Sequence, residues 1–222
     1  MAKKVIISHK SIGFETIRKN LGDRLHKKHH NMRTIILDNP HGIDTPGKRS
    51  PDGKHREYLW GRNMLNEIAQ NLINLGVSVI HSNVYEYEIG FKKRVEVMNR
   101  IPSNAFVFSL HNNAAGMGDK WLSARNPSIY TCRGETQSDT FATMIYEQII
   151  KDIPEIPWRK DMVDGDIDYE ANFAVLMSKH PSALLEWLFQ DNKEDVALLN
   201  DEKLNERLVN ALTEVLFEIS IA

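Results

Sequence analysis

The sequence has one cysteine and no long hydrophobic run. Cys132 is the only cysteine among 222 residues, which excludes an internal disulfide and a cysteine-built zinc site. No apolar stretch approaches the roughly 18 residues that a membrane-spanning helix needs. Near the N-terminus the only apolar run is residues 5–7, which is shorter than the roughly seven residues of a signal-peptide core. We therefore expect a protein made in the cytoplasm, without a secretion signal and without a transmembrane segment.

Composition and length indicate an ordinary globular chain. Apolar residues make up 41% of the sequence and charged residues 26%, the proportions of a typical soluble protein. A chain of 222 residues is long enough for one domain with a real core, with or without a short appendage.

The charge is unevenly distributed along the chain. Residues 1–33 carry nine Lys and Arg side chains but only two acidic ones, a net charge of +7, whereas the whole chain carries -2. A basic extension of this kind is drawn to anionic surfaces such as acidic lipid or wall polymer. The alternative is an amphipathic helix over about residues 14–28 that packs beside the main domain, and the composition leaves both open. A nucleic-acid partner would rest on charge alone, and we expect none for the whole chain.

From residue 34 onwards, strand-like and helix-like segments alternate. Apolar and β-branched runs predict strands at residues 34–37, 77–80, 105–111, 128–132, 173–177 and 183–188. Helical periodicity predicts helices at residues 57–75, 91–101, 138–151, 191–199 and 202–219, and residues 152–172 read as an acidic loop. This alternation predicts an α/β fold. We expect a single domain with a central mixed, largely parallel sheet of about six strands and helices on both faces.

Four side chains capable of chemistry lie at the ends or starts of these elements. His41 follows the first predicted strand and its turn, and His111 lies at the tip of the third strand. Reactive groups collect beyond the carboxyl ends of strands in open α/β sheets. Glu186 is a lone carboxylate in an apolar run, so it should be partnered, protonated or facing a cleft. Glu57 begins a predicted helix, where the helix dipole favours its ionised form.

These residue types are compatible with a metal-dependent hydrolase. Two imidazoles and one carboxylate from separate elements form a common catalytic zinc set, and a second carboxylate outside the metal shell is a usual proton carrier. The chain has nine histidines, so spacing alone does not decide between this site and an ordinary surface or core role for each of them. His55 lies two residues before Glu57 and is a rival ligand or a support for it.

Several motifs occur in a specific order along the chain. They are IILDNPHG at residues 35–42, Glu57 at a helix start, FSLHNNA at residues 108–114, and LLEWLF at residues 184–189 followed by Asn192. Together they resemble the zinc-dependent N-acetylmuramoyl-L-alanine amidases of the Amidase_3 type, the catalytic domains of bacterial autolysins and phage endolysins. Arg94 with Asn99 resembles that family's Arg-x-x-x-Ala-Asn helix, and residues 45–53 are similar to a loop in a subgroup. The resemblance covers about residues 34–220.

The resemblance implies a fold, a reaction and a set of site residues. It implies His41, Glu57 and His111 as ligands of one Zn²⁺ per chain, and Glu186 as the catalytic carboxylate. The implied reaction is hydrolysis of the amide between N-acetylmuramic acid and L-alanine in peptidoglycan or a muropeptide. Residues 34–222 would then be the amidase catalytic domain, and residues 1–33 a basic N-terminal extension. Like some phage endolysins, the protein would reach the wall through a holin-type membrane pore.

Two other functions remain compatible with the sequence. The first is a zinc peptidase or carboxypeptidase-like hydrolase, and the second is an inactive wall-binding or regulatory module.

Pro40 replaces the first glycine of the family's Gly-His-Gly, which removes a backbone N–H beside the expected ligand. We expect the placement of His41 to be intact, because proline is compatible with a turn that leaves a strand.

Overall fold

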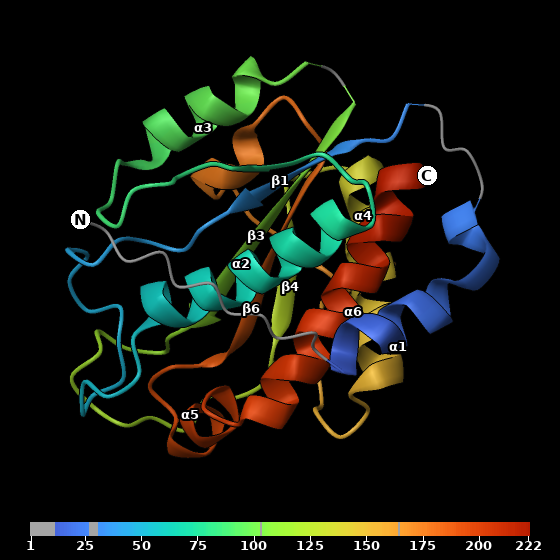
Figure 1. The fold of residues 1–222 in the computed structure, drawn as a ribbon. Coiled ribbons are helices and arrows are strands. Elements are labelled where there is room, and N and C mark those ends of the chain that lie inside the picture. The colour runs from blue at the N-terminus through green and yellow to red at the C-terminus, as the bar shows by residue number, and fades with distance from the viewer. Residues whose placement is uncertain (1–11, 27–30, 103, 164) are drawn as a thin grey trace, which may run out of the picture.

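A computed structural model describes residues 12–26, 31–102, 104–163 and 165–222 (Figure 1). The described helices are α1 (Ile12–Leu21), α2 (Glu57–Asn74), α3 (Phe91–Arg100), α4 (Gln137–Asp152), α5 (Lys193–Leu199) and α6 (Glu202–Ile221). Two short 3₁₀ helices are η1 (Gly22–His26) and η2 (Ala174–Met177). The strands are β1 (Thr34–Asp38), β2 (Val79–His81), β3 (Ala105–Asn113), β4 (Ser128–Thr131), β5 (Tyr169–Glu170) and β6 (Ser182–Phe189).

The six strands form one mixed sheet in the order β2-β1-β3-β6-β4-β5. All neighbouring strands are parallel except β6 and β4, which are antiparallel. The central pair β3–β6 has His111 opposite Glu186, and the register shifts between His111 and Asn113. The predicted α/β fold with a largely parallel six-stranded sheet is confirmed.

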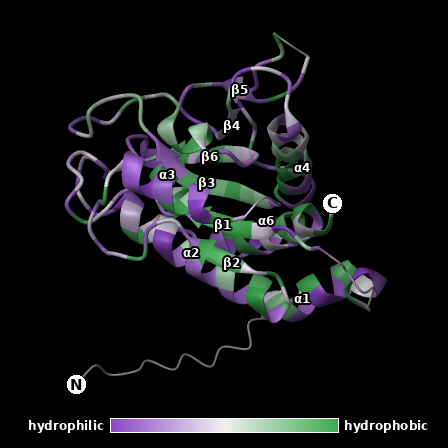
Figure 2. Ribbon diagram, turned by 90° about the horizontal axis from the view of Figure 1, so that it is seen from above, coloured by the Kyte–Doolittle hydropathy of each residue, from purple (hydrophilic) through white to green (hydrophobic). Residues whose placement is uncertain are grey.

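Helices cover both faces of the sheet because alternate residues of its strands are apolar on both sides. Ile35 and Leu37 of β1 belong to the larger core, which also contains buried residues of α2, α4 and α6. Ile36, between them, belongs to a smaller core that includes Met98 of α3 and Leu176 of η2. Figure 2 shows the central strands in hydrophobic colours between helices whose outer sides are hydrophilic.

One predicted strand is wrong, and one strand was not predicted. Residues 173–177, expected as a strand, contain the 3₁₀ helix η2, which packs on α3 and β6. Val175 and Leu176 are buried in the smaller core, whereas Phe173 and Met177 are exposed. An apolar run this short does not distinguish a strand from a helix. The sixth strand is instead β5, two residues within the segment expected to be a loop.

The described part of the basic extension packs on the last helix. Ile17 and Leu21 of α1 are fully or almost fully buried in the larger core. Asn20 Nδ2 donates to Glu214 Oε1 at 2.6 Å. Of the helix predicted over about residues 14–28, the structure has α1 at residues 12–21, packed beside the main domain. Residues 1–11 and 27–30 lie outside the described residues. The domain boundary at residue 33 stays a prediction.

Across the described part of the chain, every helix is too short or too polar to cross a membrane.

Candidate metal centre

Two imidazoles and one carboxylate meet at the carboxyl ends of β1 and β3. Glu57 Oε1 lies 2.9 Å from Nδ1 of His111 and 3.5 Å from Nε2 of His41. The two imidazole rings contact edge to face, with centroids 5.0 Å apart. One ligand atom from each residue lies within 4.8 Å of the other two, and all three residues are buried. The structure thus brings together the three residues that were expected as metal ligands, and their nitrogen and oxygen donors suit zinc.

The loop that carries His41 is held against helix α2. His41 has a φ of 48°, in the left-handed region that few residues other than glycine adopt. The preceding Pro40 lies against Gly61 of α2, where a Cβ atom at residue 61 would be 2.3 Å from Pro40 Cγ. The proline that departs from the family's motif is therefore accommodated by a glycine one turn into α2.

Hydrogen bonds hold the Glu57 carboxylate on both oxygens. The backbone N–H of Asn112 donates to Oε1 at 3.2 Å, and Gln190 Nε2 donates to Oε2 at 2.9 Å. Glu57 is the first residue of α2, and its own N–H donates to the carbonyl of Lys48 at 3.2 Å. Gln190 was not among the predicted site residues, although it directly follows β6 and lies at the same sheet edge as His111.

His55 supports the site and is not one of the clustered ligands. Its Nε2 donates to Asn112 Oδ1 at 2.7 Å, and the ring is buried. The Asn112 Nδ2 group in turn donates to the carbonyl of Trp187 on β6 at 3.0 Å. Since the backbone of Asn112 binds Glu57, His55 acts on the carboxylate through Asn112.

A buried ion pair shapes the end of β1, three residues before His41. Arg94 Nη1 of α3 donates to both Asp38 oxygens, at 3.1 and 3.0 Å, and to the carbonyl of Asn39 at 2.8 Å. Ser109 Oγ donates to Asp38 Oδ2 at 2.7 Å. Arg94 and Asp38 are both fully buried, so this pair ties α3 and β3 to the strand end from which His41 projects.

Glu186 lies beside the cluster on the neighbouring strand. It pairs with His111 across β3 and β6, and paired residues of neighbouring strands point to the same face of the sheet. Its Oε2 atom is buried and has no hydrogen-bond partner among the described residues. Burial raises the pKa of Glu186 to about 7, with the nearby Glu57 charge adding to the effect and His111 opposing it. Such a carboxyl group exchanges a proton near neutral pH.

His41 has the neutral imidazole that metal binding needs, whereas His111, whose pKa is raised beside Glu57, would have to release a proton to a metal. Burial lowers the pKa of His41 to about 3, so its imidazole is neutral, as a metal ligand must be. Burial disfavours the charged forms of both Glu57 and His111. The hydrogen bond and the opposite charges of the pair together outweigh this effect, so the pKa of Glu57 is lowered and that of His111 is raised. His111 Nε2 is buried without a hydrogen-bond partner among the described residues, and a metal ion would satisfy it.

The sequence model of one family, N-acetylmuramoyl-L-alanine amidase (Amidase_3), matches residues 35–218. The chain belongs to this family. Its members are generally zinc-dependent, and the His41–Glu57–His111 cluster is suited to a metal ion. The enzyme is thus an N-acetylmuramoyl-L-alanine amidase, which hydrolyses the amide between N-acetylmuramic acid and L-alanine in peptidoglycan.

Solved structures of amidases share the fold of this amidase. An N-acetylmuramoyl-L-alanine amidase from Clostridium difficile 630 is 21% identical, with a TM-score of 0.74 over 85% of this chain and 97% of that one. The catalytic domain of CwlV from Bacillus (Paenibacillus) polymyxa is 21% identical, with a TM-score of 0.71 over 84% and 97%. The catalytic domain of the CD27L endolysin, which targets Clostridia difficile, is 17% identical, with a TM-score of 0.58 over 84% and 97%. No curated protein is a significant match.

Proposed function

We propose that this amidase binds one zinc ion per chain through His41, Glu57 and His111 and uses Glu186 as the proton carrier. The observation that carries the proposal is the cluster itself, in which the three donor atoms lie within 4.8 Å of one another. The buried, unpartnered Nε2 of His111 supports it, because the protein supplies no other group to satisfy that atom among its described residues.

The proposed chemistry divides between the metal and the chain. When bound, zinc polarises the amide carbonyl and lowers the pKa of a bound water toward about 7. Glu186 takes a proton from the attacking water at a carboxylate oxygen while the new C–O bond forms. It then gives this proton to the amide nitrogen as the C–N bond breaks, so that L-alanine leaves as a neutral amine. The pKa of Glu186, about 7, suits a group that must both accept and donate near neutral pH.

Product analysis on purified peptidoglycan tests the reaction. The zinc-loaded protein should generate new L-alanine amino termini on the peptide stems. A carboxypeptidase-like hydrolase would instead release amino acids from the carboxyl ends of the stems, without new L-alanine amino groups. An inactive wall-binding module would bind the peptidoglycan and release neither product. Either of the last two results would reject the proposal.

We further propose that the protein is made in the cytoplasm and reaches the cell wall through a holin-type pore. The likeness to the CD27L endolysin supports this route. Expression in a sensitive host should lyse the cells only when a holin is co-expressed. Lysis without the holin would contradict the proposed route.

The basic residues 1–33 are proposed to contact anionic wall polymer or membrane. Their net charge of +7 is the support for this proposal. A deletion that removed Ile17 and Leu21 would also remove buried core residues, so charge substitution is the cleaner test. Replacing Lys3, Lys4 and Lys10 together by Gln should slow hydrolysis of intact walls and leave hydrolysis of soluble muropeptides unchanged. Equal effects on both substrates would contradict the proposed contact.

A further inference from the structure

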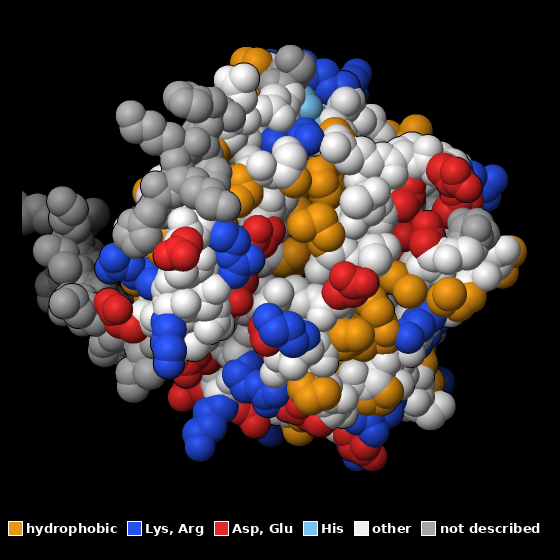
Figure 3. Space-filling view, turned by 90° about the vertical axis from the view of Figure 1, so that its right-hand side faces the viewer, with side chains coloured by type: hydrophobic (Ala, Val, Ile, Leu, Met, Phe, Trp, Pro, Cys, Tyr) orange, Lys and Arg blue, Asp and Glu red, His pale blue; other side chains and the backbone are white. Residues whose placement is uncertain are grey.

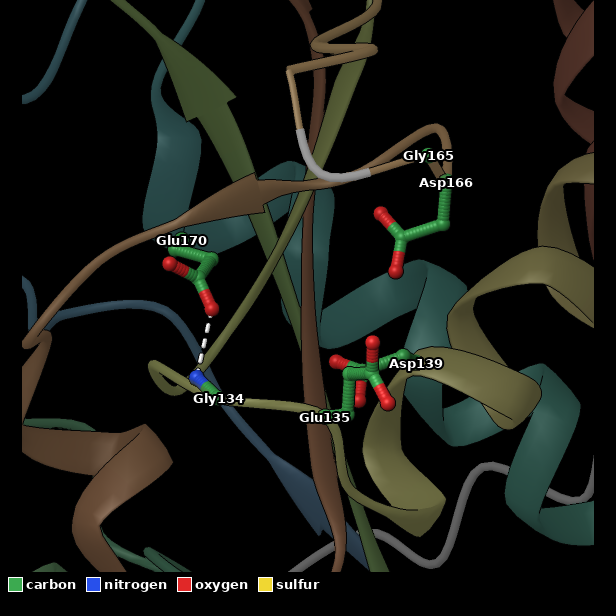
Figure 4. A pocket seen from close by; sticks show the side chains of 6 residues that line it. All are labelled: Gly134, Glu135, Asp139, Gly165, Asp166 and Glu170. Atoms are coloured by element: carbon green, nitrogen blue, oxygen red, sulfur yellow. Dashed lines mark hydrogen bonds between the residues drawn. The ribbon is translucent and has the colours of Figure 1, made fainter.

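A second group of carboxylates lies between the N-terminus of α4 and the segment that leads into β5. One oxygen each from Asp139, Asp166 and Asp168 lies within 4.8 Å of the other two. Glu135 and Glu170 line the adjoining pocket together with two glycines, and no Lys or Arg lines it among the residues that the structure describes. In Figure 4 the Asp166 carboxylate points across the pocket toward Asp139 and Glu135. Figure 3 shows acidic side chains gathered around a hollow at one edge of the molecule.

Asp168 distinguishes this group from an ordinary acidic surface. Its side chain is 1% exposed, and its Oδ2 accepts a hydrogen bond from Thr131 Oγ1 of β4 at 2.5 Å. The other oxygen, Oδ1, is buried and has no hydrogen-bond partner among the described residues. A buried carboxylate oxygen without a donor is costly, so a ligand at this atom would stabilise the ionised form of Asp168.

The electrostatics of Asp168 point to a cationic ligand. Burial raises its pKa to about 7, although the hydrogen bond from Thr131 opposes the rise; the negative charges of Asp166 and Asp139 and a side-chain hydrogen bond with Asp166 add to it. A cation among the three carboxylates would offset both the burial and the mutual repulsion.

We propose that Asp139, Asp166 and Asp168 bind a calcium ion, separate from the zinc site. All three donors are carboxylate oxygens, which hard cations prefer, and the cluster has no nitrogen or sulfur donor that would favour zinc. Two oxygens bound to one Ca²⁺ at about 2.4 Å are at most about 4.8 Å apart, and the three carboxylate oxygens lie within this limit of one another. Calcium takes 6–8 oxygen ligands. Asp139 and Asp166 are half-buried, so water can reach the site and supply the remaining ligands.

The ion would join three parts of the fold. Asp139 belongs to the first turn of α4, where its Oδ2 caps the helix by accepting from the N–H of Thr136. Asp168 directly precedes β5 and is bonded to β4 through Thr131. Calcium would therefore fasten the loop before β5, together with that edge strand, to helix α4.

Calcium titration of the zinc-loaded protein in calcium-free buffer tests the proposal. Calorimetry with CaCl₂ should give one site per chain with a Kd between about 10⁻⁵ and 10⁻³ M. The melting temperature should rise with calcium concentration, because the ion binds the folded state. Magnesium should bind more weakly, since its shorter bonds demand a tighter, near-octahedral set of ligands. No binding of calcium at about ten times the upper end of that Kd range would overturn the proposal.

Single substitutions locate the site. Asp166→Asn and Asp168→Asn should each weaken calcium binding by at least about tenfold and abolish the calcium-dependent rise in melting temperature. In calcium-free buffer Asp168→Asn should melt no lower than the unmodified protein, because it removes a buried charge. Asp161→Asn, a change in the same loop but outside the cluster, should leave calcium binding unchanged. Unchanged calcium affinity in Asp166→Asn and Asp168→Asn, with zinc content and far-ultraviolet circular dichroism retained, would overturn the assignment.

Discussion

Pro40 and Gly61 fit against each other at the base of the metal centre. A Cβ atom at residue 61 would lie 2.3 Å from Pro40 Cγ and 2.8 Å from its Cδ, which no packed structure tolerates. Pro40 directly precedes His41, so the side chain that residue 61 carries determines where the first expected metal ligand can lie. The proline that replaces a family glycine is thus compensated by a contact from α2.

Gly61→Ala should lower the free energy of unfolding by about 1–3 kcal/mol, the usual cost of overpacking, despite the better helix propensity of alanine. It should also weaken zinc binding, because Pro40 and His41 must shift together. Urea unfolding and zinc titration measure the two effects.

The double variant Pro40→Gly with Gly61→Ala is the control for this steric explanation. Removing the proline ring should restore most of the lost zinc affinity. If the double variant binds zinc no more tightly than Gly61→Ala alone, then contact with Pro40 is not the cause of the weaker zinc binding.

Arg94→Met should destabilise the protein by about 3–5 kcal/mol, because it leaves the buried carboxylate of Asp38 without its cation. Arg207→Met is a matched control, since Arg207 pairs with Glu155 on the exposed surface. It should cost less than about 1 kcal/mol. Similar losses for the two variants in urea unfolding would contradict the special role of the Asp38–Arg94 pair.

His55→Ala should weaken zinc binding about 10–100-fold without removing a ligand, because Asn112 then loses the donor that holds its side chain. His55→Gln retains an N–H donor and should recover part of this affinity. Competition with a zinc chelator gives both values. An unchanged affinity in His55→Ala would show that Asn112 holds its position without this hydrogen bond.

Glu186→Gln should reduce turnover of peptidoglycan by about 10²–10⁴-fold, the typical share of a general acid–base group. The amide is nearly the same size and cannot carry the proton, so KM should change little. Substantial remaining turnover would remove Glu186 from its proposed role.

The sequence predicted the positions along the chain of five of the six strands, and three residues that the structure brings together. His41 and His111 could be predicted because His41 follows a buried strand and His111 lies near the end of another, and strand ends meet at one sheet edge. The supporting contacts could not be found in this way. Gln190 and Glu57 are 133 positions apart in the chain, and the packing of α2 on β3 together with the β3–β6 pairing brings them together.

Short elements were the other source of error. Strand β5 has two residues, too few for an alternating pattern, and the apolar run of η2 has no period of its own. The contact between Pro40 and Gly61 has no sequence signal either, because a glycine inside a helix does not reveal which atom approaches it.

The zinc-to-protein ratio, measured on purified variants by elemental analysis, tests the central claim most directly. The account predicts about one zinc per chain in the unmodified protein and in Glu186→Gln, and almost none in His41→Ala or His111→Ala. Full zinc occupancy in both histidine variants, or loss of zinc from Glu186→Gln alone, would contradict it.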